Sequence, residues 1–414
     1  MSQQDDVAAL SQTLYGVFDD PALIALIEEA LVHNADLRAS AHRLRANALL
    51  LTPTLTASRP QLGLQGQADQ ILTGGRHDRS EQASLSVSWT LDVWGRLAAE
   101  AASAEAEHWA QSIDLDAARL SLAALVAQRW VALNAAERDT TLLHERMASL
   151  EELRLLVRGS YRAGLTGLDD EAAIRTQIEL ARSDLAAAED IVLSTRRELE
   201  VLLGRMPTAR LDTPQSAPRL HPPLTAAPAL VLAQRPDIQA AFLRLEAADQ
   251  STRAAYRALL PDLTLTGSAA RSLGERALVS NLTQWSLVGG LQQTVFDHGA
   301  LRDAARARIA LGEAAVETYR QTVLTALSEV ENALSQEQAL ARQQTALAQA
   351  LAASRLSEGH ARDRYRRGLV TAREMLQARL DHADIERAQA RTDAARLDAR
   401  IQLGLALGLP WTAQ

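Results

Sequence analysis

The chain repeats itself, and a duplicated sequence restricts the fold to one that builds the same unit twice. Residues 161–165 read YRAGL and recur as YRRGL at residues 365–369. Other landmarks recur at the same or a slightly shorter spacing, which a short indel explains: Leu203-Gly204 with Leu407-Gly408, Gly95-Arg96-Leu97 with Gly299-Ala300-Leu301, Asp36-Leu37 with Asp237-Ile238, and Pro60 with Pro261. The sequence therefore predicts two similar halves.

A proline-rich segment separates the halves. Half of the chain's 12 prolines lie between residues 205 and 228, which is typical of an extended linker. The expected organisation is a first repeat at 1–204, a linker at 205–228 and a second repeat at 229–414. Each repeat is expected to run helix, strand, strand, long helix, turn, helix.

Alternating polar and apolar residues predict four strands, at about 59–69, 84–93, 261–270 and 285–295, joined as hairpins by loops at 71–81 and 272–282. A single alternating run usually belongs to a half-buried sheet of a soluble protein. Here the polar face is Ser, Thr, Gln and Asp, and the length suits the roughly 9–11 residues of a strand that crosses a bilayer. Lipid does not tolerate open sheet edges, and four strands cannot enclose a water-filled pore. Several chains must then pool their strands.

Long helices are expected at about 95–160, 168–203, 300–359 and 372–407. The first contains no proline, and at about 1.5 Å per residue it would be on the order of 100 Å long. Its apolar residues follow a heptad pattern that Arg129 and Arg146 interrupt. A coiled coil alone usually indicates a scaffold. Combined with amphipathic hairpins in both repeats, it favours a membrane barrel prolonged by a helical tube.

Composition excludes several kinds of chemistry. The sequence has no lysine, so all 43 basic residues are arginine, and it has no cysteine. Schiff-base chemistry, thiolate catalysis and thiolate zinc sites are therefore excluded, and we expect neither an enzyme nor a cofactor. The net charge of −8 gives no reason to expect nucleic acid as a partner. His382 and Asp384 lie two residues apart and do not share a helix face, so no metal site is expected there.

No apolar stretch is long enough for a transmembrane helix. Residues 1–6 lack a basic region followed by an apolar run, so no signal peptide is visible. The expectation is that an export segment has been removed from the sequence.

Several motifs resemble those of the TolC-like outer membrane efflux factors, particularly the NodT-like drug-efflux branch. They are RPDI at 235–238, PDLTLTG at 261–267, WTLDVWGR at 89–96 and the two turns at 161–164 and 365–368. The resemblance covers roughly residues 20–410. Phe242 stands where the family usually carries Glu, and the lipid-accepting cysteine common in this branch is missing.

The resemblance implies a mainly α protein with a small membrane β part, assembled as a homotrimer with a twelve-stranded β-barrel in the outer membrane of a Gram-negative bacterium. It also implies a twelve-helix α-barrel in the periplasm that docks to a periplasmic adaptor (membrane fusion) protein and an inner membrane pump of the RND type. The expected function is passive exit of small molecules, with outer membrane lipid around the barrel. The alternatives are a type I secretion duct for polypeptides and a soluble coiled-coil scaffold.

On the family pattern, the two turns form the periplasmic tip and carry the candidate functional residues. Carboxylates that narrow the tunnel can set selectivity, although acidic residues are also ordinary in the first turn of a helix. The gate candidates are Glu374, Gln377 and Asp170. The adaptor-docking candidates are Arg162, Gly164, Leu165, Thr166, Arg366, Gly368, Leu369, Val370 and Thr371, and the candidates for a latch are Tyr161 and Tyr365.

Overall fold

A computed structural model describes residues 20–73, 76–164, 167–211, 234–274 and 282–409. The chain forms two compact units, each built from both repeats. Unit 1 comprises Met1–Ala39, Leu115–Pro236 and Leu324–Gln414, and unit 2 comprises Ser40–Asp114 and Asp237–Val323. The expected boundary at 205–228 separates the repeats along the chain, and most of it lies outside the described residues.

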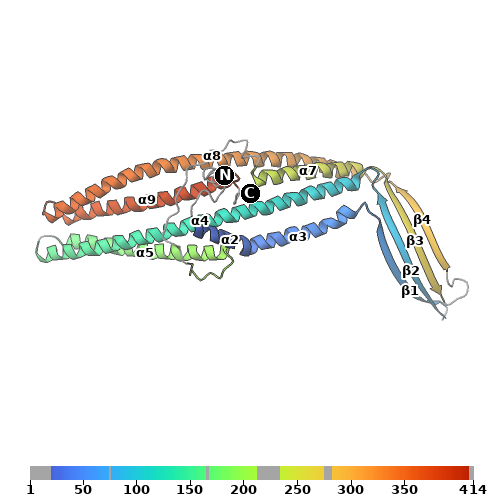
Figure 1. Cartoon of the computed structure of the whole chain (residues 1–414), viewed down its shortest axis with the longest axis horizontal. Helices are drawn as coiled ribbons and strands as arrows, with labels where there is room; N and C mark the ends of the chain where they lie inside the picture. Colours follow the sequence, from blue (N-terminus) through green and yellow to red (C-terminus); the bar gives the residue numbers. More distant parts are fainter. Residues whose placement is uncertain (1–19, 74–75, 165–166, 212–233, 275–281, 410–414) are drawn as a thin grey trace, which may run out of the picture. The chain divides into compact units, whose positions relative to one another are not determined.

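Unit 2 contains one antiparallel sheet in the order β1-β2-β3-β4 (Figure 1). The strands are β1 (Gln61–Thr73), β2 (Arg76–Leu91), β3 (Asp262–Gly274) and β4 (Leu282–Gln292). Each repeat supplies one hairpin, and the pairing of β2 with β3 joins the two repeats.

The expected loop at 71–81 is wrong, because β1 and β2 continue through most of it and Ile71 pairs with Asp78. Backbone hydrogen bonds extend this hairpin past the point where the alternating pattern fades. The strand expected at 285–295 instead covers Leu282–Gln292, and β2 ends at Leu91, before Val93. Both strands end early because an aspartate turns the chain into a helix: Asp92 accepts from the amides of Leu97 and Ala98, and Asp297 from those of Gly299 and Leu301.

The register places most of the leucines and both tryptophans of the four strands on one face. Leu64 pairs with Leu85, and Trp89 pairs with Leu265. Directly paired residues point to the same side of a sheet, so the face is continuous. Its side chains remain exposed, 81% for Leu64 and 80% for Trp285. Among the described residues, β1 and β4 each have one edge without a strand partner.

Helices precede and follow each hairpin. They are α2 (Pro21–His33), α3 (Ala35–Thr56), α4 (Arg96–Arg162), α5 (Leu168–Leu202), α7 (Pro236–Arg257), α8 (Ala300–Arg366) and α9 (Ala372–Ala406). The described residues contain no helix that is both long and apolar enough to cross a membrane. Helix α8 runs past the expected end at Gly359, because one glycine costs a helix only about 1 kcal/mol.

Corresponding residues of the two repeats join the helices of unit 1 in parallel ways. The Asn34 side chain donates to the carbonyl of Leu202 at 3.0 Å, at the end of α5. At the equivalent place Arg235 donates to the carbonyl of Ala406 at 2.9 Å, at the end of α9. A Cβ on Gly204 would lie 2.5 Å from the carbonyl oxygen of His33, so only glycine permits this close approach.

Candidate functional site: the helix tips and the seam between helix pairs

The turns between α4 and α5 and between α8 and α9 lie at the same end of unit 1 (Figure 1). Gly164 has φ of 72° and Gly368 has φ of 71°, the left-handed conformation that glycine often adopts at a helix end. Each amide donates to a tyrosine carbonyl, Tyr161 or Tyr365, at 2.9 Å. A Cβ on either glycine would meet nothing within 4 Å, so conformation alone requires glycine there.

A buried cluster beneath the turns fixes the ends of the helices. Leu153 and Val157 of α4 pack with Ile174 of α5 and with Met375 and Leu376 of α9. All five side chains are at most 5% exposed. The heptad pattern of α4 therefore produces the core that holds both turns in place.

Thr371 caps the start of α9, and Glu374 contacts this cap. The Thr371 hydroxyl accepts from the Glu374 amide at 3.2 Å, and the Glu374 carboxylate lies 3.4 Å from the same hydroxyl. This is the Thr-x-x-Glu arrangement that satisfies free amides at a helix start. Gln377, one turn further, donates to Asp381 at 2.7 Å. Glu374, Gln377 and Asp381 are all exposed on α9.

Asp170 makes a different contact from its repeat counterpart Glu374. Its carboxylate lies 3.8 Å from the Arg373 guanidinium, and its side chain is 23% exposed. The pair links the start of α5 to the start of α9. Sequence reasoning missed Arg373, because no local pattern marks a residue whose partner belongs to another helix.

The described docking candidates lie at the surface of the turns. Leu369 is 63% exposed, Val370 is half-buried, and Arg162, Arg366 and Thr371 are exposed. Leu165 and Thr166 lie outside the described residues. Tyr161 is exposed, whereas Tyr365 packs against the buried cluster. Neither hydroxyl makes a hydrogen bond to another described residue.

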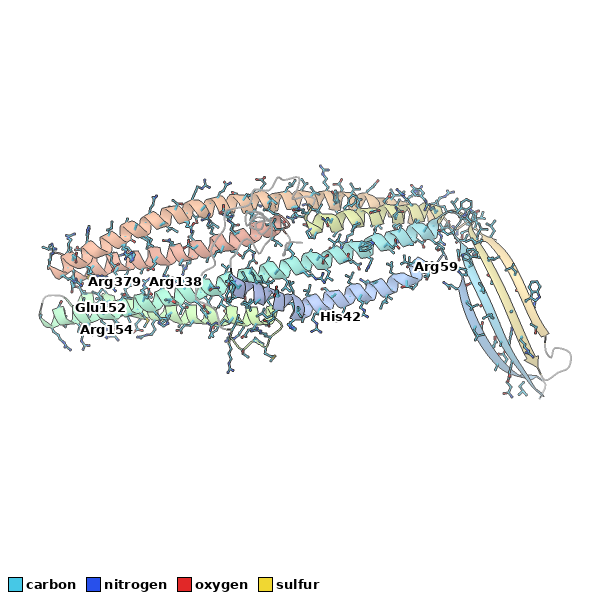
Figure 2. All side chains as sticks on the ribbon, viewed as in Figure 1. His42, Arg59, Arg138, Glu152, Arg154 and Arg379 are labelled. Atoms are coloured by element: carbon cyan, nitrogen blue, oxygen red, sulfur yellow. The ribbon has the colours of Figure 1, made fainter. Side chains whose placement is uncertain are left out.

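Further from the turns, ion pairs connect α4 to α9. We call the residues of these pairs the seam: Asp139, Arg146 and Glu152 of α4, and Arg379, Asp384 and Arg387 of α9. Arg387 binds Asp139 through two hydrogen bonds of 2.8 Å, with the side chains 14% and 20% exposed. The hydrogen bonds from Arg387 lower the pKa of Asp139. Nearer the turns, Arg379 donates to Ser149 at 2.5 Å and lies 3.9 Å from Glu152; both charged residues are labelled in Figure 2.

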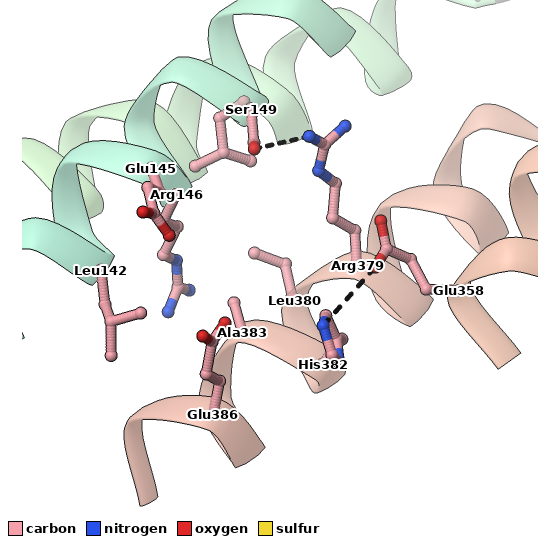
Figure 3. Close-up of a pocket in the computed structure, with 11 residues that line it drawn as sticks. Leu142, Glu145, Arg146, Ser149, Glu358, Arg379, Leu380, His382, Ala383 and Glu386 are labelled. Carbon is pink, nitrogen blue, oxygen red and sulfur yellow. Dashed lines mark hydrogen bonds and ion pairs between the residues drawn. The ribbon is translucent and has the colours of Figure 1, made fainter. Parts of the chain in front are cut away.

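A cavity of about 160 Å³ opens on the seam between α4, α8 and α9 (Figure 3). Arg146 lines this cavity and pairs with Asp384 at 2.6 Å. The arginine that interrupts the heptad pattern of α4 therefore makes a contact between α4 and α9. His382 lies 2.9 Å from the Ser354 hydroxyl and 3.9 Å from the Glu358 carboxylate. Within the described part of the chain, no three His, Cys, Asp or Glu side chains are grouped so that they could hold a metal ion.

This chain combines an exposed apolar sheet with long paired helices, and that combination is typical of outer membrane channel subunits. The model of the family described as "Outer membrane efflux protein" matches residues 26–205 and 227–409, and the chain belongs to this family. It is 30% identical to the pyoverdine export outer membrane protein OpmQ of Pseudomonas putida, over 97% of this chain and 89% of OpmQ. It is 28% identical to the toluene efflux pump outer membrane protein TtgC of Pseudomonas putida, over all of this chain and 88% of TtgC.

Solved structures agree with this assignment. The outer membrane channel OprN has a TM-score of 0.86 at 26% identity, over 96% of this chain and 92% of OprN. The open state of the MtrE channel of Neisseria gonorrhoeae gives the same TM-score and identity, over 98% of this chain and 94% of MtrE. The protein is thus an outer membrane efflux channel of a Gram-negative bacterium that extends into the periplasm. Its family is one of channel components that work with adaptor and inner membrane pump proteins.

Proposed function

We propose that three copies of the chain pool their sheets into one twelve-stranded barrel and their helices into one periplasmic tunnel. The observation that carries this proposal is the four-stranded sheet, with its exposed apolar face and two open edges. Lipid can cover the apolar face, but the unpaired amides and carbonyls of β1 and β4 need partner strands within the bilayer. Helix α5 supports the same conclusion, since Leu168 and Leu180, which line one open groove on it, are 64% and 54% exposed.

The native mass in mild detergent, with the detergent contribution subtracted, tests the assembly. The protein is expressed with an export signal and extracted from outer membranes. We expect the mass of three chains. A monomer that remains soluble without detergent would overturn the proposal and favour the coiled-coil scaffold.

The channel conducts small molecules passively, has no catalytic activity of its own, and draws its energy from the inner membrane partner. Relatives named for export of pyoverdine and efflux of toluene support small solutes. A second candidate is a polypeptide secretion duct. Expression in a strain that lacks its own efflux channel separates the two candidates. Lower accumulation of a fluorescent dye supports small solutes, whereas release of a secreted polypeptide without any change in dye level supports the duct.

The helix turns dock a periplasmic adaptor, which connects the channel to an RND-type pump. The exposure of the turns and their rigid core support this role, because a docking surface must be both accessible and ordered. The proposed docking residues are Arg162, Gly164, Leu165, Thr166, Arg366, Gly368, Leu369, Val370 and Thr371. Tyr161 and Tyr365 are proposed to latch neighbouring helix pairs across copies.

Glu374 and Gln377 line the narrowest part of the tunnel, and Asp170 holds it closed through Arg373. Three copies of Glu374 would form a carboxylate ring that attracts cations. The test is the reversal potential of single channels under a KCl gradient. We expect Glu374→Gln to lower cation selectivity and Glu313→Gln, an exposed change on α8, to leave it unaltered. If Glu374→Gln lowers only thermal stability, then the residue is a helix cap and not a gate.

A further inference from the structure

The helix ends that lead into the two turns, at Gly164 and Gly368, share one backbone geometry, but the two turns differ in charge. Their glycines have φ values of 72° and 71°, and the same tyrosine carbonyl to glycine amide bond of 2.9 Å closes each turn. A partner that meets both of these helix ends therefore finds nearly the same backbone twice. Any preference for one turn must come from side chains.

The α8–α9 turn carries a cluster of arginines that the α4–α5 turn lacks. Arg364, Arg366 and Arg367 are all exposed. The duplication provides an internal comparison, because each residue has a counterpart at the repeat spacing: Ser160 for Arg364, Arg162 for Arg366, and Ala163 for Arg367.

The residues that follow each turn increase this difference. The α5 helix begins with three acidic residues in its first turn, Asp169, Asp170 and Glu171, whereas the first turn of α9 has Glu374 alone. Arg373 stands at the position equivalent to Asp169. Negative charge therefore follows the α4–α5 turn, whereas positive charge dominates the α8–α9 turn, in a chain whose net charge is −8.

The arginine cluster has no ionic partner among the described residues. Neighbouring arginines do have partners: Arg362 lies 2.6 Å from Glu358, and Arg373 lies 3.8 Å from Asp170. No described carboxylate lies within ion-pair distance of Arg364, Arg366 or Arg367.

The helix dipole does not account for the cluster. Cations at a helix C-terminus are favourable, typically by about 0.3–1 kcal/mol, but the effect applies equally to both long helices. Helix α4 is as long as α8, at 67 residues. It carries only one basic residue in its last turn, Arg162, whereas α8 carries Arg364 and Arg366. Adding like charges side by side costs energy, so the fold gains little from them.

We propose that the α8–α9 turn binds a carboxylate-rich hairpin of a protein partner and that the α4–α5 turn disfavours it. The inference rests on the docking role proposed above and specifies the chemistry of the partner. Complementary charge speeds association, and like charge rejects the wrong pairing. Charge would then fix which hairpin of the adaptor meets which turn around the ring.

Two synthetic helical hairpins that differ only in having Glu or Lys in the turn provide the probes. Their binding to the detergent-solubilised full chain is followed by fluorescence anisotropy at low salt, where surface charges are least screened. We expect the Glu hairpin to bind at least ~10-fold more tightly than the Lys hairpin, a difference of about 1.4 kcal/mol. The combined variant Arg364→Gln, Arg366→Gln, Arg367→Gln should lose this preference.

The matched control removes the same number of exposed arginines from α4 and α5, outside the proposed docking residues, through Arg158→Gln, Arg175→Gln and Arg182→Gln. The preference for the Glu hairpin should survive in it. Equal binding of the two hairpins, no binding of the Glu hairpin to the unaltered chain, or an equal loss in the control would each overturn the inference. Native mass and channel conductance, measured on the same samples, separate this failure from failure of the channel assembly itself.

Discussion

Removal of the Arg387–Asp139 pair should destabilise unit 1 more than removal of any exposed ion pair. The pair joins α4 to α9 through two hydrogen bonds of 2.8 Å, and its side chains are 14% and 20% exposed. At an effective dielectric constant of about 20, opposite charges about 4 Å apart attract by roughly 4 kcal/mol. Desolvation cancels much of this gain, so we expect a net loss of about 1.5–3 kcal/mol per chain for Arg387→Gln or Asp139→Asn.

A double-mutant cycle measures the coupling between the two residues. Unfolding by guanidinium chloride is followed in detergent for each single variant and for the double variant. The matched control is Arg182→Gln, which removes an exposed pair whose side chains are 57% and 58% exposed. Such pairs contribute about 0.2–1 kcal/mol, so a loss for Arg387→Gln no larger than that of the control would refute the reasoning.

The same pair predicts a pH dependence. The hydrogen bonds from Arg387 hold the pKa of Asp139 below its ordinary value. A carboxyl whose folded pKa is lowered contributes stability that is complete above its unfolded pKa, about 3.9, and is lost as pH falls through the folded pKa. The stability difference between the unaltered chain and Asp139→Asn should therefore be constant at neutral pH and shrink below about pH 4. A difference that persists unchanged at pH 3 would show that Asp139 acts through packing.

Three further predictions test the local physics, each through shifts in the unfolding midpoint. Gly368→Ala places a Cβ on a residue with φ of 71° and should cost about 1 kcal/mol, whereas Gly359→Ala inside α8 should stabilise by about 0.5–1 kcal/mol. Thr371→Ala removes the cap of α9 and should cost about 1 kcal/mol, a loss that Thr371→Ser should largely avoid. Burial disfavours the charged form of Glu200, but hydrogen bonds from the Ala209 and Arg210 amides outweigh it and lower the pKa. Glu200→Gln should therefore cost about 1.5–3 kcal/mol at neutral pH and less in acid.

The helices and the sheet were predictable because their signals are local and repeated. Two-residue alternation identifies β2, and heptad spacing identifies α4, although neither determines where an element ends. The end of β2 depends on Asp92, whose carboxylate binds the amides of Leu97 and Ala98. The continuation of the first hairpin through Ile71 depends on backbone pairing, which leaves no pattern in the side chains.

The helix-tip residues were less predictable than the helices that carry them. The left-handed glycines follow from the sequence, since few other residues tolerate that conformation. The pairing of Asp170 with Arg373 does not, because it depends on how α5 and α9 approach each other. The seam has the same property: Arg146 and Arg387 interrupt or flank the apolar pattern in the sequence, and their partners are known only once α4 lies against α9.

Duplication explains why equivalent positions at the two turns could diverge in role. Glu374 and Asp170 occupy the same place in their repeats, yet Glu374 contacts its own helix cap and Asp170 contacts Arg373 of the neighbouring hairpin. The glycine, the tyrosine carbonyl and the buried cluster fix the backbone at the helix end before each turn, so substitutions at exposed positions there alter charge without altering the backbone. In the trimeric assembly proposed above, a ring of such helix ends would alternate in charge. A partner could then distinguish the α8–α9 turn from the α4–α5 turn by the charge of their side chains.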